Sequence, residues 1–319
     1  HVMDLGITGK NAIVCASSKG LGKACAMALA AEGVNVWICA RHEETLDRAA
    51  ADIAAAGGGS ATPVVADVTT DEGRSALLAA CPAPDILVNN AGGPPPGDFR
   101  DWRQQDWFDA VNANMYSAID MIRRCLDGMV ERGFGRIVNI TSVAVKLPVK
   151  PLGLSNGARA GLTGFISGIA REPAQHNVTI NNLLPGFIAT DRMWSVLDDG
   201  ARAGGQEPEK YREAIFSRGG AGRPGDPAEF AAACAFLCSR RASYITAQNI
   251  LVDGGLPQSA ALIDANIRDL GFNPLDIRAI LVSHAHFDHA GGVAALQDLT
   301  RANVYTSQAG SETLTLGAL

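Results

Sequence analysis

The sequence lacks the features that would point to a membrane protein or a nucleic-acid-binding protein. No apolar run approaches the roughly 20 residues that a helix needs to cross a bilayer. The N-terminus does not show the charged-then-apolar order of a secretory signal peptide. The basic residues are dispersed and the net charge is −6, which argues against nucleic acid as a main partner. We therefore expect a cytoplasmic protein that binds neither membrane nor nucleic acid.

Cysteine pairing motifs are also missing. The seven cysteines stand singly in apolar or helical contexts, their number is odd, and no CxxC pair occurs. Reduced, partly buried thiols are therefore the best interpretation. The 319 residues are enough for one large domain, or for one domain and a smaller unit.

Apolar segments and helical patterns alternate over the first 250 residues. "NAIVCA" predicts a strand and "GLGKACAMALAAEG" predicts the helix that follows it. Further strands are expected at 34–40, 61–67, 84–92, 135–142, 178–186 and 248–255. Such βα units predict an α/β fold, a Rossmann-type doubly wound parallel sheet with helices on both faces. The polar segment 190–215 interrupts the series and suits a mobile cover over a cleft.

The segment "CASSKGLGKA" lies between the first strand and the first helix. Gly20 and Gly22 permit a tight turn and the close approach of a pyrophosphate to the helix N-terminus. An acid after the second strand would bind the two free hydroxyls of an adenosine ribose, but this chain has Arg41 there, and Lys19 lies in the glycine loop. Two cations and no acid favour a 2′-phosphate, and hence NADP(H) over NAD(H). The alternative is that both cations are solvated surface charges.

These motifs together resemble the short-chain dehydrogenase/reductase family, especially its bacterial 3-oxoacyl-carrier-protein reductase-like members, over residues 4–256. The resemblance rests, in order along the chain, on "CASSKGLG", Ala66-Asp67, "NNAGG", Asn114, "NITS", "LLPGFIATD" and "LVDGG". One departure is Cys15-Ala16, where the family usually has Thr-Gly. The resemblance implies an NADP-binding oxidoreductase domain over residues 1–256 that acts on a small-molecule carbonyl substrate.

The resemblance also implies which residues contact the cofactor and how the chain assembles. The implied contacts are Ser17, Ser18, Lys19, Gly20, Leu21, Gly22, Arg41, Asp67, Val68, Asn89, Ala91, Gly92, Pro185, Gly186, Ile188 and Thr190. Asp67 and Val68 would contact adenine, and the last four would flank the nicotinamide. Long helices, expected at 105–131 and 153–175, would join the chain into a homodimer or homotetramer, and small residues such as Gly157 and Gly161 suit close helix contact.

The catalytic positions that the resemblance implies do not all hold the family's usual residues. In the family, Asn, Ser, Tyr and Lys act together: hydride passes to the carbonyl carbon while Tyr protonates the oxygen, Lys lowers the pKa of Tyr, and Ser polarises the carbonyl. Asn114 and Ser142 match, but Ser155 stands at the Tyr position and Arg159 at the Lys position. This Ser-Asn-x-x-Arg pattern is similar to that of a natural subgroup of the family.

The replacements change the chemistry that the centre offers. A phenol with a pKa of about 10 can be tuned toward neutrality, whereas an aliphatic hydroxyl is a far poorer acid. Arginine can hold a ribose hydroxyl but does not release its proton. Lys146, Lys150, Tyr211 or water remain as alternative proton donors. The sequence thus supports an oxidoreductase with an atypical centre, and leaves open a nucleotide-binding protein with little turnover.

Residues 253–310 closely resemble part of a metallo-β-lactamase and predict a small C-terminal α/β extension, with strands at 278–283 and 303–306. The resemblance implies His284 and His286 as ligands of one zinc ion, and Asp288 and His289 as ligands of another. That family needs further histidines, none follows in this sequence, and a stable zinc site takes three or four protein ligands. We therefore expect a metal motif without a complete site, and favour NADP(H) over zinc as the cofactor.

The two resemblances meet at Asp253-Gly254-Gly255, because both families carry a similar "DGG" word. A fusion or a misjoined gene is the simple interpretation, with 257–319 as an incomplete metallo-β-lactamase-like fragment. A zinc-dependent hydrolase whose missing ligands come from a second chain is the alternative.

Overall fold

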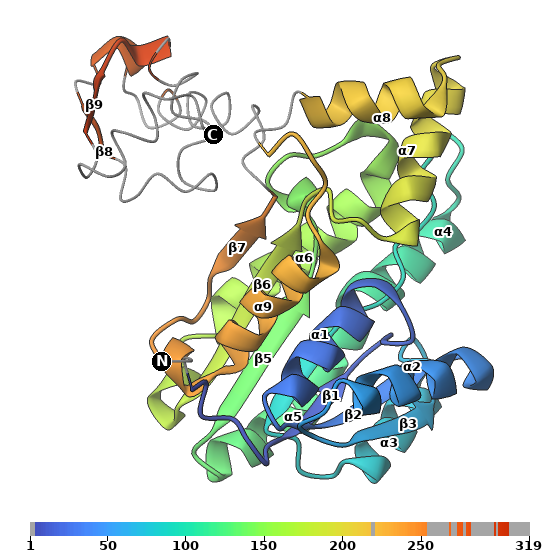
Figure 1. The fold of residues 1–319 in the computed structure, drawn as a ribbon, viewed down its shortest axis with the longest axis vertical. Coiled ribbons are helices and arrows are strands. Elements are labelled where there is room, and N and C mark those ends of the chain that lie inside the picture. Colours follow the sequence, from blue (N-terminus) through green and yellow to red (C-terminus); the bar gives the residue numbers. More distant parts are fainter. Residues whose placement is uncertain are drawn as a thin grey trace. The chain divides into compact units, whose positions relative to one another are not determined.

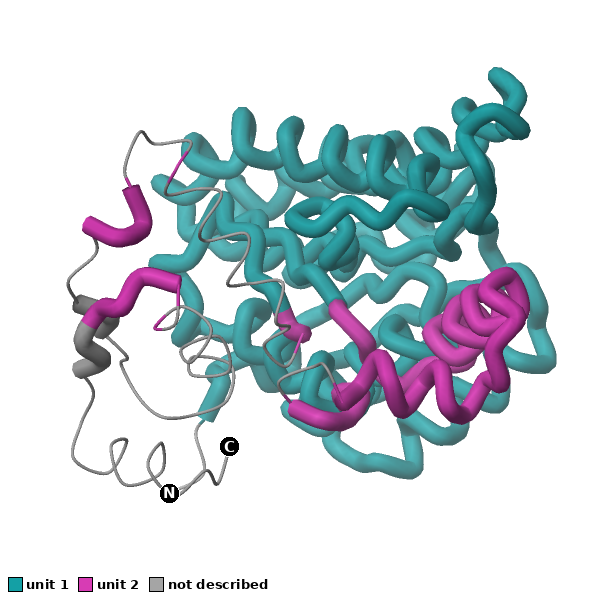
Figure 2. The backbone as a smooth tube through the Cα atoms, turned by 90° about the horizontal axis from the view of Figure 1, so that it is seen from above, with its two compact units in different colours: residues 1–185, 226–251 teal, residues 186–225, 252–319 magenta. Residues whose placement is uncertain are grey.

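The computed structural model describes residues 4–217 and 221–253, together with short pieces at 268, 273–276, 279–281, 297 and 299–305. The chain forms two compact units (Figure 2). The first comprises residues 1–185 and 226–251, and the second comprises residues 186–225 and 252–319. The expected domain boundary at residue 256 stays a prediction.

A seven-stranded sheet forms the centre of the fold, in the order β3-β2-β1-β4-β5-β6-β7 (Figure 1). From β3 to β6 all pairs are parallel. The sheet confirms the predicted doubly wound architecture, because the chain proceeds outward from β1 to one edge and then from β4 to the other. The strands are β1 Asn11–Val14, β2 Asn35–Ala40, β3 Ala61–Val65, β4 Ile86–Asn89, β5 Gly135–Ile140, β6 Val178–Pro185 and β7 Asn249–Val252.

Helices connect the strands, as parallel pairing requires. They are α1 Gly20–Ala31, α2 Glu43–Ala55, α3 Asp71–Ala80, α4 Gln104–Val111, α5 Ser117–Glu131, α6 Gly153–Ile169 and α9 Pro227–Cys238. Short helical turns add η1 Asn112–Tyr116, η2 Val143–Val145, η3 Lys150–Leu152, η4 Pro173–His176 and η5 Arg240–Ala242. Helix α1 packs against α9, and η1 joins α4 to α5.

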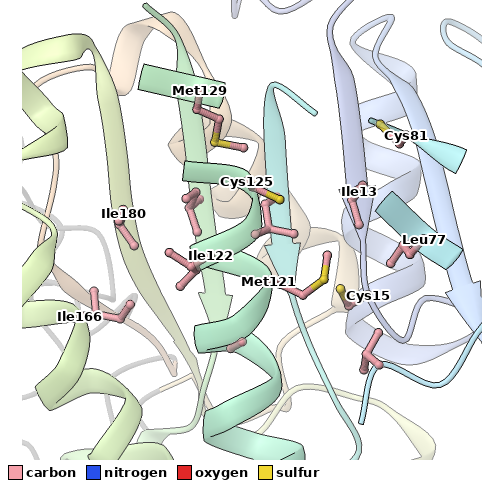
Figure 3. Packing of buried hydrophobic residues seen from close by; sticks show 14 of the residues in the cluster. Ile13, Cys15, Leu77, Cys81, Met121, Ile122, Cys125, Met129, Ile166 and Ile180 are labelled. Carbon is pink, nitrogen blue, oxygen red and sulfur yellow. The ribbon is translucent and has the colours of Figure 1, made fainter. Parts of the chain in front are cut away.

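Helices α3, α5 and α6 share one hydrophobic core with the strands (Figure 3). Met121, Cys125 and Met129 recur at four-residue spacing, which places them on one face of α5. This face packs with strand residues such as Ile13 and Ile180. Full burial of one such side chain contributes about 1.5–3 kcal/mol, so the core fixes the strand ends that carry the polar residues described next.

All seven cysteines are free in the structure, as expected, and all are buried, whereas we expected partial burial. In the described ranges, no helix is both long and apolar enough to cross a membrane.

The second unit begins with helices α7 Asp191–Ala203 and α8 Pro208–Ser217. The segment that we expected to be a mobile cover is therefore helical. The ring of Phe216 contacts that of Trp194 edge-on at 5.9 Å between centroids, and Arg212 lies over Trp194 and pairs with Asp198. Aromatic and ionic contacts thus hold the two helices together.

The C-terminal part of this unit contains the two strands that the tail was expected to form. Strands β8 Ala279–Leu281 and β9 Asn303–Tyr305 pair in parallel, with Ala279 opposite Asn303. They follow the turn η6 Pro274–Asp276. The expected metal residues His284, His286, Asp288 and His289 lie outside the described residues.

Candidate active site

A small cavity of about 20 Å³ lies at the carboxyl ends of β1, β4 and β5. In a doubly wound sheet this edge, where the strand order reverses, is the usual place for a ligand. The cavity brings together residues that are far apart in sequence, and five of the predicted site residues are among them. These five are Val68, Asn89, Ala91, Asn114 and Arg159, and Cys15, Asn90, Ser117 and Ile140 join them.

The glycine loop after β1 adopts the tight turn expected of it. Ala16 and Gly20 both have positive φ, at 46° and 58°. Gly22 is required for packing, because a Cβ at this position would lie 2.5 Å from the carbonyl oxygen of Ala16. The same oxygen accepts a hydrogen bond from Nδ2 of Asn90 at 3.2 Å. The loop thus places the N-terminus of α1, whose first backbone N–H groups have no partner within the helix, at the carboxyl edge of the sheet.

Ser17, predicted as a cofactor contact, is completely buried in this loop. Its hydroxyl donates to the carbonyl oxygen of Val14 at 2.7 Å and accepts from the backbone N–H of Cys39 at 3.1 Å. These bonds tie the loop to β1 and β2, so its side chain holds the shape of the loop. A contact between Ser17 and the cofactor stays a prediction, as it does for Ser18 and Leu21.

Lys19 and Arg41, the two predicted phosphate-binding cations, are exposed. Lys19 immediately precedes α1, and Arg41 immediately follows β2. Neither side chain has a hydrogen bond or an ion pair with any residue that the structure describes. Both charges are therefore available to an anionic ligand.

Asp67 and Val68, the predicted adenine contacts, follow β3. Oδ1 of Asp67 accepts from the backbone N–H and from the hydroxyl of Thr69, at 2.9 and 2.8 Å. Thr70 then caps α3 by accepting from Gly73. These bonds fix the direction of the Asp67 carboxylate and place the buried side chain of Val68 in the cavity wall.

Asn89 belongs to a row of asparagine side chains that crosses four strands, a feature not predicted from the sequence. Nδ2 of Asn89 donates to Asn139 at 2.9 Å, Asn139 donates to Asn182 at 3.0 Å, and Asn182 donates to Asn249 at 2.7 Å. A buried amide needs its partners, so each member fixes the next. The only sequence signal is an asparagine within each of four otherwise apolar strand motifs.

Asn114 lies in η1, a π-helical turn between α4 and α5. Such turns are frequent at functional sites. Its Nδ2 donates to the carbonyl oxygens of Gly92 and Ala110, at 3.3 and 3.4 Å. Its Oδ1 is buried and accepts no hydrogen bond from the described residues. An acceptor of this kind, in the wall of a cavity, is suited to a water molecule or to a hydroxyl group of a ligand.

Arg159 and Ser155 lie one helical turn apart near the start of α6, and both are 8% exposed. Nη1 of Arg159 donates to the carbonyl oxygens of Ile140 and Thr141, at 2.8 and 2.9 Å. Its Nε donates to Oγ of Ser155 at 3.2 Å. The Ser155 oxygen therefore accepts from a cation, which leaves its own O–H free to donate.

Ser142 directly follows Thr141, one of the two residues whose carbonyls Arg159 binds. Its Oγ accepts from the backbone N–H of Ala144 at 3.1 Å, so Ser142 caps the turn η2. Like Ser155, it retains a hydroxyl proton to donate. The end of β5 and the start of α6 thus carry two serine hydroxyls and one guanidinium.

The described residues of the cavity wall offer hydrogen-bond donors but no carboxylic acid or phenol. Among its described lining residues, Cys15 and Arg159 are the ionisable ones. The hydrogen bond with the Cys39 thiol and burial together raise the pKa of Cys15 well above its usual value, so Cys15 stays a neutral thiol at pH 7. The alternative donors Lys146 and Lys150 are exposed, and Tyr211 lies on α8 in the second unit.

The predicted nicotinamide-flanking residues divide between the two units. Pro185 ends β6, whereas Gly186, Ile188 and Thr190 lie in the second unit. There, Ile188 pairs with Gly225, and the Thr190 hydroxyl caps α7 by accepting from Met193 at 3.3 Å. Within the described residues no cluster of three or more potential metal ligands occurs.

Two family models match the chain. Residues 15–257 match the one described as enoyl-(acyl carrier protein) reductase, and residues 242–318 match the metallo-beta-lactamase superfamily. The two matches overlap, and the overlap contains Asp253-Gly254-Gly255, where the two sequence resemblances meet.

Characterised relatives cover most of the chain. It is 36% identical over 256 residues to the 3-oxoacyl-(acyl-carrier-protein) reductase FabG of Vibrio harveyi, a match that covers 79% of this chain and 99% of the relative. It is 32% identical over 255 residues to the NADPH-dependent reductase BacG of Bacillus subtilis, covering 78% of this chain and 98% of that protein.

Solved structures show the same architecture. L-sorbose reductase from Gluconobacter frateurii, complexed with NADPH and L-sorbose, has a TM-score of 0.74 and 30% identity, and the match covers 80% of this chain and 98% of that one. Actinorhodin polyketide ketoreductase with NADPH has a TM-score of 0.73 and 31% identity, covering 78% of this chain and 97% of that one.

Proposed function

This chain belongs to the short-chain dehydrogenase/reductase family, and on that premise we propose that it is an NADP(H)-dependent oxidoreductase with an atypical catalytic centre. Its substrate is a small molecule with a carbonyl or hydroxyl group. One observation carries the proposal: Arg159 donates to Ser155 at 3.2 Å, next to the cavity at the carboxyl edge of the sheet. The two replaced residues therefore form a joined unit, with the hydroxyl held by the cation.

The residues at the carboxyl edge fit a phosphorylated dinucleotide. The glycine loop has the positive φ angles that bring the N-terminus of α1 close to a pyrophosphate. Lys19 and Arg41 have no partner among the described residues, and each can pair with a 2′-phosphate. The relatives that were solved as NADPH complexes support the same choice. We assign Asp67, Val68, Asn89, Ala91 and Gly92 to the walls of the cofactor groove.

The bound cofactor supplies the hydride, and the side chains of this chain bind and polarise the carbonyl. Ser142 and Ser155 donate hydrogen bonds to the carbonyl oxygen, on which negative charge develops. The guanidinium of Arg159 stabilises that charge through Ser155, because it donates to the Ser155 oxygen. Oδ1 of Asn114, which accepts no hydrogen bond from the described residues, is the proposed acceptor for a water molecule in the site. Neither serine is a strong enough acid to complete the transfer, so the proton comes from this water or from bulk solvent.

A direct assay of NADPH consumption tests the proposal. NADPH consumption is followed against a panel of carbonyl compounds with the wild type, Ser155→Ala and the control Ser167→Ala. Ser167 lies on the same helix, where its hydroxyl donates to the carbonyl oxygen of Thr163. We expect turnover of at least one compound, a loss of rate in Ser155→Ala and no loss in Ser167→Ala. NADPH binding without turnover of any compound would favour the rival hypothesis of a nucleotide-binding protein.

Exposed apolar side chains support a homo-oligomer. Trp107, Phe108, Val111 and Tyr116 lie on α4 and η1, and between 37% and 57% of each remains exposed. Contiguous exposed apolar residues commonly mark a protein interface. We propose that a second copy covers them in a homodimer or homotetramer.

Two glycines that we expected at such an interface, Gly157 and Gly161, pack against side chains of the same chain. A Cβ on Gly157 would lie 3.1 Å from the ring of Trp107, and one on Gly161 would lie 2.8 Å from the sulfur of Met115. Their small size is therefore explained by the packing of α6 against α4 and η1, and the proposed interface rests on the exposed side chains.

We propose that residues 257–319 form a metallo-β-lactamase-like segment whose four matched residues do not by themselves make a hydrolase site. The resemblance assigns two ligands to each of two zinc ions, fewer than the three that a catalytic zinc keeps. Incubation with zinc and a chromogenic cephalosporin tests this. Zinc-dependent hydrolysis that His286→Ala abolishes would instead favour the hydrolase, with further ligands donated by a second chain.

A further inference from the structure

A second cavity, of about 390 Å³, lies at the amino-terminal edge of the sheet. Its lining comes from residues that precede or begin β1, β5 and β6 and from the turn η5. These residues are Lys10, Arg132, Gly133, Phe134, Arg136, Asn177, Arg240 and Ser243. Because the strands are parallel, their amino ends lie at the edge opposite the carboxyl ends, so this cavity is separate from the candidate active site.

Arg136 is the central observation. It is fully buried, yet no carboxylate pairs with it among the described residues. Its Nε donates to the carbonyl oxygen of Ser239 at 2.9 Å, and Nη1 donates to those of Gly135 and Asn177, at 2.8 and 2.7 Å. Its Nη2 donates once, to Oδ1 of Asn177 at 3.0 Å.

These bonds leave Arg136 short of one acceptor and of a negative charge. A guanidinium carries five N–H groups, so one on Nη2 has no acceptor among the described residues. Carbonyl dipoles solvate the charge but do not neutralise it, and an unpaired buried charge is costly. Burial and the nearby charge of Arg240 accordingly lower the pKa of Arg136, although it stays protonated near neutral pH.

The other cations around the cavity add to this excess of positive charge. Lys10 pairs with Asp85 at 3.2 Å, and no other carboxylate within the described ranges pairs with a lining cation. Arg240 has no side-chain hydrogen bond or ion pair with any described residue. Among the described residues, the Arg132 side chain donates a hydrogen bond only to the carbonyl oxygen of Pro84. Three positive charges therefore border one cavity, and no described acid pairs with any of them.

We propose that this cavity is a binding site for a small phosphate-bearing anion. A phosphate group carries nearly two negative charges and three acceptor oxygens, and it pairs with arginine in a bidentate manner. The cavity volume falls within the range of small-molecule sites. Arg136, in the cavity wall, adds a fixed positive charge, and the exposed Arg132 and Arg240 are the donors that contact the ligand.

Titration calorimetry of the full chain with inorganic pyrophosphate, at constant ionic strength, tests the site. Arg240→Gln should weaken binding by about 10–100-fold, the range expected for one charge-assisted contact. Arg241→Gln is the matched control, because Arg241 is the next residue on η5, does not line the cavity and donates to the carbonyl oxygen of Asp4. It should leave the affinity within about twofold of wild type, as expected for a charge outside the contact.

The cofactor loop could also attract pyrophosphate, so a Lys19→Ala/Arg41→Ala variant is titrated in parallel. Retained binding in this variant places the ligand at the amino-terminal edge, whether or not the proposed oxidoreductase function holds. No binding by the wild type, equal weakening by Arg241→Gln, or loss of binding in the cofactor-loop variant would each overturn the proposal. If Arg240→Gln does not fold, Arg132→Gln serves in its place, since Arg132 is exposed.

Discussion

The guanidinium of Arg159 donates from Nε to the hydroxyl oxygen of Ser155 across 3.2 Å, one turn apart on α6. The same guanidinium binds the last carbonyl of β5 and the one after it. Arg159 therefore positions Ser155 against the end of β5, where Ser142 follows. Ser155 and Arg159 thus stand where the family has its acidic Tyr and its Lys. The cation is kept, but the acid is replaced by an aliphatic hydroxyl.

The first prediction restores that acid. Ser155→Tyr combined with Arg159→Lys should raise the rate of NADPH-dependent reduction of a simple ketone by about 10–100-fold, at or below the low end of what general acid catalysis supplies. Ser155→Phe with Arg159→Lys is the control, because it has the ring without the hydroxyl. Equal rates in the two double variants, measured by steady-state kinetics, would show that the proton does not pass through this position.

The second prediction concerns cofactor choice. Arg41 is exposed and unpaired among the described residues, so it can form a charge-assisted contact with a 2′-phosphate, worth about 1.5–3 kcal/mol. The wild type should bind NADPH more tightly than NADH, and Arg41→Asp should reverse the preference. Arg48→Asp, an exposed position on α2, is the control and should leave it unchanged. Equal affinity of the wild type for both cofactors in a fluorescence titration would contradict this account.

The third prediction concerns the glycine loop. Ala16 has a φ of 46°, in the left-handed region that costs a residue with a side chain about 1–2 kcal/mol. Ala16→Gly removes this strain, while glycine costs about 0.5–1 kcal/mol of unfolded-state entropy, so the net gain should be about 0.5 kcal/mol. Ala12→Gly, in the extended strand β1, should destabilise the protein instead. Urea unfolding measures both, and a loss of stability in Ala16→Gly would contradict the strain argument.

The fourth prediction concerns pH. Asp120 is 1% exposed, and it accepts from Arg74 and Arg123 at 2.7 Å each. Burial alone would raise the pKa of Asp120, but these hydrogen bonds outweigh burial and lower it. A carboxyl whose folded pKa is depressed stabilises the fold above its unfolded pKa near 4, and this stability is lost as the pH falls through the folded value.

Asp120→Asn should therefore lower the free energy of unfolding by about 2–4 kcal/mol at pH 7 and flatten its dependence on pH below about 4. Asp127→Asn, at an exposed position on the same helix, is the control and should change neither. The readout is urea unfolding at pH 3 to 7. An unchanged acid limb in Asp120→Asn would assign the acid sensitivity to another carboxyl.

Much of the fold could be predicted from the sequence, because buried parallel strands give short apolar runs that helical patterns separate. All seven strands of the sheet were expected near their observed positions, and so were β8 and β9. The helices α7 and α8 were not, because Gly200 and the Gly204-Gly205 pair suggest a loop when their surroundings are unknown.

The sequence proposes the residues of the candidate site but not their contacts. The order of the motifs located Asn114, Ser142, Ser155 and Arg159, but the hydrogen bond from Arg159 to Ser155 depends on rotamers that spacing does not determine. The row from Asn89 to Asn249 was missed for a related reason. It depends on the order and register of four strands, which only the folded sheet provides.

The central claim is that this chain transfers hydride from NADPH to a carbonyl carbon through a centre built on Ser155 and Arg159. The most direct measurement uses NADPH labelled with deuterium at C4 of the nicotinamide, on the transferred face, with mass spectrometry of the alcohol product. The account predicts one deuterium on the former carbonyl carbon, with label transfer slowed in Ser155→Ala and unchanged in Ser167→Ala. An unlabelled product, or no product from any carbonyl compound that the wild type is offered, would contradict it.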